Sequence, residues 1–302
     1  MAPRLRVLDH DVRTECANLN LRLHYPTIRQ AQAMVEPFID AVGDYIAHFC
    51  LPRTEIEQVY SKQVSLSSFD FHAEITRLNQ RALNLFRKAS AEANRNGEAG
   101  ELILFILTEW MLEAPQLIAK MSLKTNSEMP VHGADGVHVK FVPETGRLIL
   151  YSGEAKLYKD VHKAISSAVA SIADALSYDK MKHELELVQR NIQFSGLTSA
   201  ARDTLLRYLD PFDEQSIDRF DVVTCLIGFD FEGYSMLPEH GDDANQVFLQ
   251  LAAKNLAEIG PSMAAALKNA SLGASHVELF LLPMPSVQKL RDRFQSRIGW
   301  TK

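Results

Sequence analysis

One stretch of the sequence, FDVVTCLIGFD (Phe220–Asp230), is apolar at almost every position. Side chains alternate between the two faces of a strand, so a continuous apolar run indicates a strand that is buried on both faces. Strands of this kind occur in sheets that helices cover. The composition agrees with a soluble globular protein, because 46% of the residues are hydrophobic and 23% are charged.

The apolar pattern along the chain predicts which other segments are helices and strands. A buried helix is expected at residues 101–113, and a second helix, capped by Asp160, carries an apolar stripe over residues 161–176. Strands are expected at residues 19–25, 117–123, 131–142, 147–156 and 276–283. Further helices are expected at residues 27–50, 70–94, 181–192 and 243–259, with a basic helix last. This order predicts an α/β fold with a mixed central sheet flanked by helices.

The polar stretch ANRNGEAG, which contains two glycines, breaks the pattern near residue 95. We therefore expect an N-terminal, mostly helical α/β region over residues 1–95 and a second domain over residues 96–302. No chemistry can be identified in residues 1–95, so a role in docking a partner is our hypothesis for them. The chain has no pattern of a signal peptide and no apolar run long enough to span a bilayer, which predicts a cytoplasmic protein.

The segment from His132 to Lys156 has the pattern of a β-hairpin with its turn at PETG. If the residues on either side of this turn pair with each other, Asp135 lies opposite Glu154, with Cβ atoms about 4.5–5.5 Å apart. Glu154 and Lys156 are two residues apart, so both project from one face of the sheet. That face also carries apolar residues nearer the turn, namely Val137, Val139, Phe141, Leu148 and Leu150.

Two neighbouring carboxylates repel each other unless a positive charge lies between them. A Mg²⁺ ion accepts carboxylate oxygens and keeps several waters, one of which becomes a better nucleophile. A lysine beside the ion can orient that water or offset charge on a phosphate oxygen. Asp135, Glu154 and Lys156 therefore form a candidate site for hydrolysing a phosphodiester, and the alternative is a solvated cluster of ion pairs.

The order helix, three strands, helix and strand, with GAD entering the second strand and EAK leaving the third, resembles the restriction-endonuclease-like PD-(D/E)xK nuclease core. This resemblance covers about residues 97–230. The longer string GADGVHV…GRLILYSGEAKLYKDVHKAISSAV resembles the HamA family, the nuclease subunits of the Hachiman antiphage defence system. One departure is Ala134, which stands where the name of the superfamily has a proline.

The resemblance implies that Asp135 and Glu154 are metal ligands and that Lys156 is the catalytic lysine. It also implies a third acid from the helix before the sheet, for which GEAGE offers Glu98 and Glu101. We prefer Glu101, because it lies where the apolar helix starts and its side chain can reach the edge of the sheet. The alternative for either glutamate is an ordinary acid of the first turn that interacts with the helix dipole.

Lys159, His162 and Lys163 follow this motif and form a local basic patch with Lys156. Lys159 and Lys163 are candidates for nucleic-acid binding, because lysines can contact phosphates without regard to sequence. The alternative is a solvated start of the next helix. The chain as a whole carries a net charge of −6, whereas a free-standing nucleic-acid-binding protein is usually basic.

The resemblance thus implies a metal-dependent DNA nuclease that uses Mg²⁺, or Mn²⁺ in its place, and defends against phage. It also implies a partner helicase, HamB-like, which would explain how an acidic chain meets DNA. No membrane and no small-molecule cofactor is expected. The alternative function is that of a non-catalytic nucleic-acid-binding or scaffold subunit on a degenerate nuclease fold.

Overall fold

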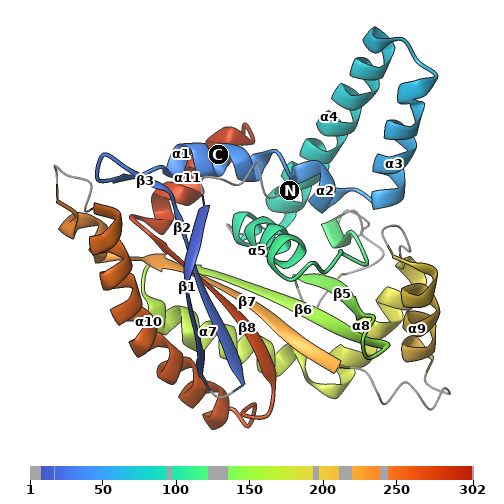
Figure 1. The fold of residues 1–302 in the computed structure, drawn as a ribbon. Coiled ribbons are helices and arrows are strands. Elements are labelled where there is room, and N and C mark those ends of the chain that lie inside the picture. Colours follow the sequence, from blue (N-terminus) through green and yellow to red (C-terminus); the bar gives the residue numbers. More distant parts are fainter. Residues whose placement is uncertain are drawn as a thin grey trace.

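The computed structural model describes residues 8–16, 18–93, 97–121, 135–192, 197–210, 220–238 and 244–300. A six-stranded sheet forms the centre of the molecule, and helices cover both of its faces (Figure 1). The expectation of an α/β fold with a mixed central sheet flanked by helices is therefore confirmed. Within the described part of the chain, none of the helices combines the length and the apolar character that crossing a bilayer requires.

The strands lie in the order β1-β2-β8-β7-β6-β5. Four neighbouring strands, β2, β8, β7 and β6, are parallel, and an antiparallel strand, β1 or β5, closes each edge. Their bounds are Leu8–Cys16 for β1, Leu19–Pro26 for β2, Gly136–Val142 for β5, Arg147–Tyr158 for β6, Phe220–Asp230 for β7 and His276–Met284 for β8. The predicted buried strand, β7, thus lies inside the sheet and not at its edge.

The side chains of β7 alternate between two hydrophobic cores. Val222 and Leu226 belong to the core on one face, whereas Val223, Cys225 and Ile227 belong to the core on the other. Burial on both faces explains why the strand is apolar at almost every position.

The first core lies under helices from both halves of the chain. These helices are α1 (Val35–Gly43), α2 (Ile46–Cys50), α4 (Ser68–Ala93), α5 (Glu98–Met111) and α11 (Val287–Arg297). α5 packs on β6 and β7, and its long buried run explains its apolar sequence. The helix was predicted at residues 101–113, so its start is three residues earlier than expected.

The opposite face is covered by α7 (Val161–Ala175) and α10 (Ala244–Asn269). Asp160 caps α7 as predicted, since its Oδ1 accepts a hydrogen bond from the backbone N–H of Lys163 at 2.8 Å. α8 (Tyr178–Asn191) and α9 (Ser199–Leu209) contribute residues to a third, smaller core against β5 and β6. The helix α9 was not predicted from the sequence. The helix α10 continues ten residues beyond its predicted end, through Pro261.

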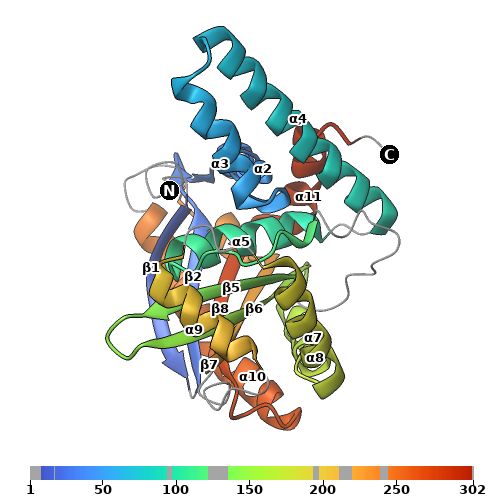
Figure 2. The same ribbon diagram turned by 90° about the vertical axis from the view of Figure 1, so that its right-hand side faces the viewer.

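The N-terminal region contributes both to the sheet and to a projecting arm. β2 pairs with β8, so a strand from the first 95 residues lies beside a strand from the end of the chain. α3 (Arg53–Ser61), the short helix η2 (Lys62–Val64) and α4 form a helical arm that extends away from the sheet (Figures 1 and 2). The expected boundary near residue 95 stays a prediction, because it falls on residues outside the described part.

Two predicted elements differ from the structure. No strand forms at residues 117–121, where a single bridge joins Gln116 to His138 of β5, and residues 122–123 lie outside the described part. The expected long helix at residues 27–50 is instead the short hairpin of β3 (Ile28–Arg29) and β4 (Gln32–Ala33), followed by α1 and α2. Gln30 and Ala31 at the turn have positive φ angles, which no helix accommodates. Residues 131–134 of the predicted hairpin also lie outside the described part.

Candidate active site

The strands of the predicted hairpin pair in the predicted register. β5 and β6 are antiparallel, and the pairs extend from the PETG turn to Gly136 opposite Gly153. Asp135 lies in a bend directly before β5, and not inside the strand as expected. The regular pairs end at Gly136, and the backbone N–H of Asp135 bonds to Gly153, one residue out of that register, so Asp135 meets β6 next to Glu154 without forming a regular pair with it.

Two hydrogen bonds hold Asp135 against β6. Its backbone N–H donates to the carbonyl oxygen of Gly153 at 2.7 Å, and its Oδ2 accepts from the backbone N–H of Ala155 at 2.8 Å. Because β5 does not extend this far, the carboxylate takes the place of a backbone acceptor from a neighbouring strand. The use of a side-chain acceptor instead of a backbone acceptor explains why the chain bends at Asp135 and why its side chain lies along the edge of the sheet.

Glu154 and Lys156 form an ion pair on the same face of β6. The Lys156 Nζ lies 2.6 Å from the Glu154 Oε1, and the side chains are 20% and 12% exposed, respectively. Glu154 pairs across the sheet with Cys225 of β7, whose side chain lies in the core beneath α7 and α10. The charged pair therefore lies on the α7 side of the sheet and is only partly open to solvent.

The charges of both acids act on the lysine. Burial lowers the pKa of Lys156, but the hydrogen bond and charge of Glu154, followed by the charge of Asp135, raise it more. The net pKa is above the ordinary value of 10.5, so the ammonium stays protonated at neutral pH. The structure thus brings together Asp135, Glu154 and Lys156, the three residues that the sequence selects.

Cys225 borders this cluster without taking part in it as a nucleophile. Burial, and then the charge of Glu154, raise the pKa of its thiol well above the ordinary value. A thiol that stays protonated is a weak nucleophile and a weak metal ligand. Cys225 is therefore a packing residue beneath the charged pair.

The start of α5 lies directly on β6, on the face of the strand opposite to Glu154 and Lys156. A side chain at Gly100 would meet Leu157 at 3.1 Å and Ala155 at 3.3 Å, so any other residue would require these neighbours to shift by a few tenths of an ångström. This close approach determines where the acids of the first turn of α5 can reach. Glu101 and Asp135 line one narrow pocket, together with Gly153 of β6.

Glu98 lies on a different side of α5. Its side chain is buried, with the residue 6% exposed, and it lines a small pocket with Arg291 and Phe294 of α11. Of the two candidates for a third acid, the structure brings Glu101, and not Glu98, to the side of Asp135. The role of Glu101 as a metal ligand stays a prediction.

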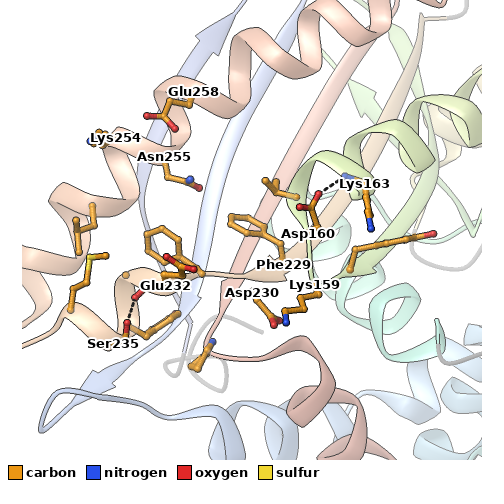
Figure 3. A pocket seen from close by; sticks show the side chains of 18 residues that line it. Lys159, Asp160, Lys163, Phe229, Asp230, Glu232, Ser235, Lys254, Asn255 and Glu258 are labelled. Atoms are coloured by element: carbon orange, nitrogen blue, oxygen red, sulfur yellow. Dashed lines mark hydrogen bonds between the residues drawn. The ribbon is translucent and has the colours of Figure 1, made fainter.

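Lys159 and Lys163 both line a larger pocket that begins at Tyr158, the last residue of β6 (Figure 3). Lys159 directly follows the strand, and Lys163 lies in the first turn of α7. The two lysines thus lie beyond the end of β6, the strand that carries Glu154 and Lys156. Their contact with nucleic acid stays a prediction.

The other walls of this larger pocket were not predicted from the sequence. They come from the segment after β7, including Phe231 and Tyr234, and from Asn255 of α10. A usable signal was the stretch FDFEGYSM, in which aromatic and acidic residues follow directly on a buried strand. No signal in the sequence indicated that α10 faces this segment, because that contact depends on the order of strands in the sheet.

The donor atoms of the cluster fit a magnesium ion that is held in part by its substrate. Among the residues that the structure describes, no three His, Cys, Asp or Glu side chains are grouped as a metal cage. Asp135 and Glu154 offer two carboxylates, and Mg²⁺ is commonly held by one or two carboxylates together with waters and phosphate oxygens. The donor set is therefore suited to Mg²⁺ or Mn²⁺ and unsuited to a closed structural zinc site.

Comparison with known proteins identifies one family. The HamA family model matches residues 3–298, which is nearly the whole chain. No curated protein matches the sequence. The resemblance to HamA that the sequence motifs carry is thus confirmed over both the sheet and the projecting arm.

Proposed function

Because the chain belongs to the HamA family, whose members are components of the Hachiman antiphage defence system, we propose that it is the DNA nuclease of that system. In this proposal the chain hydrolyses phosphodiester bonds of DNA, depends on Mg²⁺ or Mn²⁺, and is controlled by a partner helicase. The observation that carries the proposal is the cluster of Asp135, Glu154 and Lys156, in which a protonated lysine lies beside two carboxylates.

The order of elements around the cluster supports a PD-(D/E)xK nuclease core. A buried helix, α5, precedes the antiparallel pair β5 and β6, and the helix α7 and the parallel strand β7 follow. The acids lie at the end of β5 and on β6, as in the motif that the sequence resembles. The single bridge at Gln116 stands where the first of three strands was expected.

Each member of the cluster has a distinct role in the proposed reaction. Asp135 and Glu154 would hold the metal, with Glu101 as the third acid from the side of α5. A bound Mg²⁺ lowers the pKa of water and offsets charge on a phosphate oxygen. Lys156 stays cationic, so it can orient the attacking water and stabilise negative charge that develops on the phosphate.

The bonds within the cluster keep these groups in place before DNA arrives. The Glu154 carboxylate is fixed by Lys156, and the Asp135 carboxylate is fixed by the backbone of Ala155. Preorganised charges of this kind need little rearrangement in the transition state, which is why they contribute strongly to catalysis. A solvated ion pair on an open surface would have no such constraint.

A partner helicase would deliver the DNA. The net charge of −6 gives the chain no general attraction to nucleic acid, whereas Lys159 and Lys163 supply positive charge close to the cluster. Residues 1–95 are proposed to dock the partner. At the tip of the projecting arm, Val64 is 96% exposed and Phe69 is 85% exposed, and apolar side chains so open to water are suited to burial against another protein.

The proposal is tested by incubating the purified chain with linear and with circular DNA, with and without its helicase, in Mg²⁺ or in EDTA. We expect cleavage that requires the metal and that the helicase controls. If neither the chain nor the complex cleaves any of these DNAs, the chain is instead a scaffold or nucleic-acid-binding subunit.

A further inference from the structure

The pocket beyond Tyr158 is large and has a defined place in the fold. Its volume is about 1220 Å³, above the range of about 300–1,000 Å³ that is usual for small-molecule sites. It lies between α7, the short helix η4 (Glu232–Met236) and α10, where the parallel strands β6 and β7 end (Figure 3). The carboxyl ends of parallel strands are the usual position of ligand sites in α/β sheets.

One wall of the pocket is aromatic and well fixed. The rings of Phe231 and Tyr234 have centroids 6.1 Å apart and lie edge to face at 81°. The hydroxyl of Tyr234 donates to the carbonyl oxygen of Pro283 at 3.1 Å. A side chain at Gly233 would come within 2.3 Å of the Phe231 ring, so glycine is required for this arrangement. Both rings are only partly buried, which leaves a surface on which a planar group can stack.

Asn255 extends from α10 toward the middle of the pocket (Figure 3). Its Oδ1 is buried, and no hydrogen-bond partner for it lies within the described residues. A buried amide without a partner costs stability unless a ligand or water satisfies it. An amide group offers both a donor and an acceptor, as the edge of a nucleobase does.

Two of the three lysines that line the pocket lie on the wall nearest to the candidate active site. Lys159 and Lys163 flank the first turn of α7, whose backbone N–H groups favour an anion. Of the four acids that line the pocket, two are engaged: Asp160 accepts from the backbone of α7, and the Oδ1 of Asp230 accepts from the N–H of Val287 at 2.6 Å.

The other two acids, Glu232 and Glu258, are exposed, and Glu258 lies one turn from Lys254 on α10. Lys159 and Lys163 thus share the α7 end of the pocket with Asp160 and Asp230, whose carboxylates are held by backbone N–H groups, and the aromatic and amide groups lie at the other end.

We propose that this pocket binds one unpaired nucleotide of DNA, with its phosphate at Lys159 and Lys163 and its base against Phe231, Tyr234 and Asn255. The inference rests on the proposed nuclease function and adds a substrate class to it. Tyr158 lies two residues beyond Lys156 on β6, a distance of about 7 Å along a strand. A strand cut at the cluster would thus place a neighbouring nucleotide at the pocket, and only an unpaired base can enter it.

Binding in EDTA tests this inference separately from catalysis, because no cleavage is needed. Fluorescence anisotropy of the full chain is measured with a labelled single-stranded oligonucleotide, with blunt duplex DNA and with a competing free mononucleotide. We expect Asn255→Leu and Lys163→Gln each to weaken single-strand binding about fivefold, the scale of one lost hydrogen bond, and to leave duplex binding unchanged. Asn269→Leu and Lys268→Gln, at the exposed end of α10, are the matched controls and should bind like the wild type.

The two pocket variants should melt like the wild type, because Asn255 lacks a partner for its Oδ1 and Lys163 is exposed. If the two variants weaken only the binding of the free mononucleotide, the pocket takes a free nucleotide, and the assignment to a DNA strand is overturned. If the variants weaken the binding of neither the oligonucleotide nor the mononucleotide, the pocket is not a nucleotide site. Glu154→Gln separates the two proposals, since it should lose cleavage and keep single-strand binding.

Discussion

The Nζ of Lys156 lies 2.6 Å from the Oε1 of Glu154, two residues away on the same face of the same strand. Asp135 reaches this pair from the end of the neighbouring antiparallel strand, where its carboxylate binds the backbone of Ala155. Alternating charges on the solvated face of one strand can form ion pairs without a residue from a second strand. The convergence of two strands is what distinguishes this cluster from an ordinary surface ion pair.

The metal response should differ between the two members of the ion pair. Glu154→Gln keeps the size of the side chain but removes the charge of a proposed ligand, so Mg²⁺ binding should weaken at least about tenfold. Lys156→Met removes a cation that is no ligand, and Mg²⁺ binding should be retained or strengthened. Isothermal titration calorimetry without DNA measures both. Unchanged Mg²⁺ binding in Glu154→Gln would show that Glu154 is not a ligand.

The activity should not depend on deprotonation of Lys156 in the neutral range. Because Glu154 and Asp135 raise the pKa of Lys156 above its ordinary value of 10.5, the ammonium is present throughout neutral and mildly alkaline pH. The ion pair stabilises the folded state below pH 10.5, and this contribution is lost only as the pH rises through the folded-state value. The pH–rate profile of the wild type should therefore show no decline below about pH 10 that is caused by Lys156. Any alkaline decline below that pH should also be present in Lys156→Met.

The stability of the fold should fall in mild acid because of His138. Burial lowers the pKa of this histidine, so the folded protein binds a proton less readily than the unfolded chain. Its contribution is complete above pH 6.5 and decreases as the pH falls below that value. The difference in melting temperature between about pH 7.5 and about pH 5.5 should be smaller in His138→Asn, which keeps a donor for the carbonyl oxygen of Ala114.

The exposed His72 provides the control for this measurement. His72→Asn should leave the pH dependence of melting unchanged. The explanation fails if His138→Asn and the wild type lose the same stability between the two pH values.

The tip of the helical arm should contribute to partner binding without contributing to the fold. Phe69 is 85% exposed and packs against little of its own chain, so Phe69→Asp should leave the melting temperature near that of the wild type. The same change should weaken the complex with the helicase at least about tenfold if the side chain is buried there. Analytical ultracentrifugation or surface plasmon resonance with the purified helicase measures this loss.

Leu206→Asp on α9 is the matched control, because Leu206 is also an exposed apolar residue but lies far from the arm in the sequence. It should bind the helicase like the wild type. Unchanged affinity of Phe69→Asp would exclude the tip of the arm as the docking site.

The parts of the fold that local patterns determine could be predicted from the sequence. The register of β5 and β6 follows from the PETG turn and the alternation of apolar residues, and the burial of β7 follows from its continuous apolar run. The strand expected at residues 117–123 was wrong because of tertiary contacts that the local sequence pattern does not show. Its backbone pairs with β5 only around Gln116, where Leu117 and Pro115 bond to Val137 and Val139, and the chain then turns away.

The candidate site could be predicted in part. The pairing of Gly136 with Gly153, which brings Asp135 to β6 near Glu154, follows from hairpin register, which is a local property. The choice between Glu98 and Glu101 could not be settled by the sequence, because it depends on how α5 is rotated on β6. The close contact of Gly100 with Ala155 and Leu157 determines that rotation, and Glu101 then lines one narrow pocket with Asp135.

The central claim is that the cluster on β5 and β6 is the seat of DNA cleavage. The most direct measurement is the rate at which the purified complex with its helicase degrades linear DNA in Mg²⁺, compared among the wild type, Glu154→Gln and Lys156→Met. Melting temperature and partner binding are measured on the same samples. We expect wild-type cleavage that EDTA abolishes and a loss of at least about 10²-fold in each variant, with both variants folded and bound to the helicase. Cleavage at the wild-type rate by both folded variants would contradict the claim.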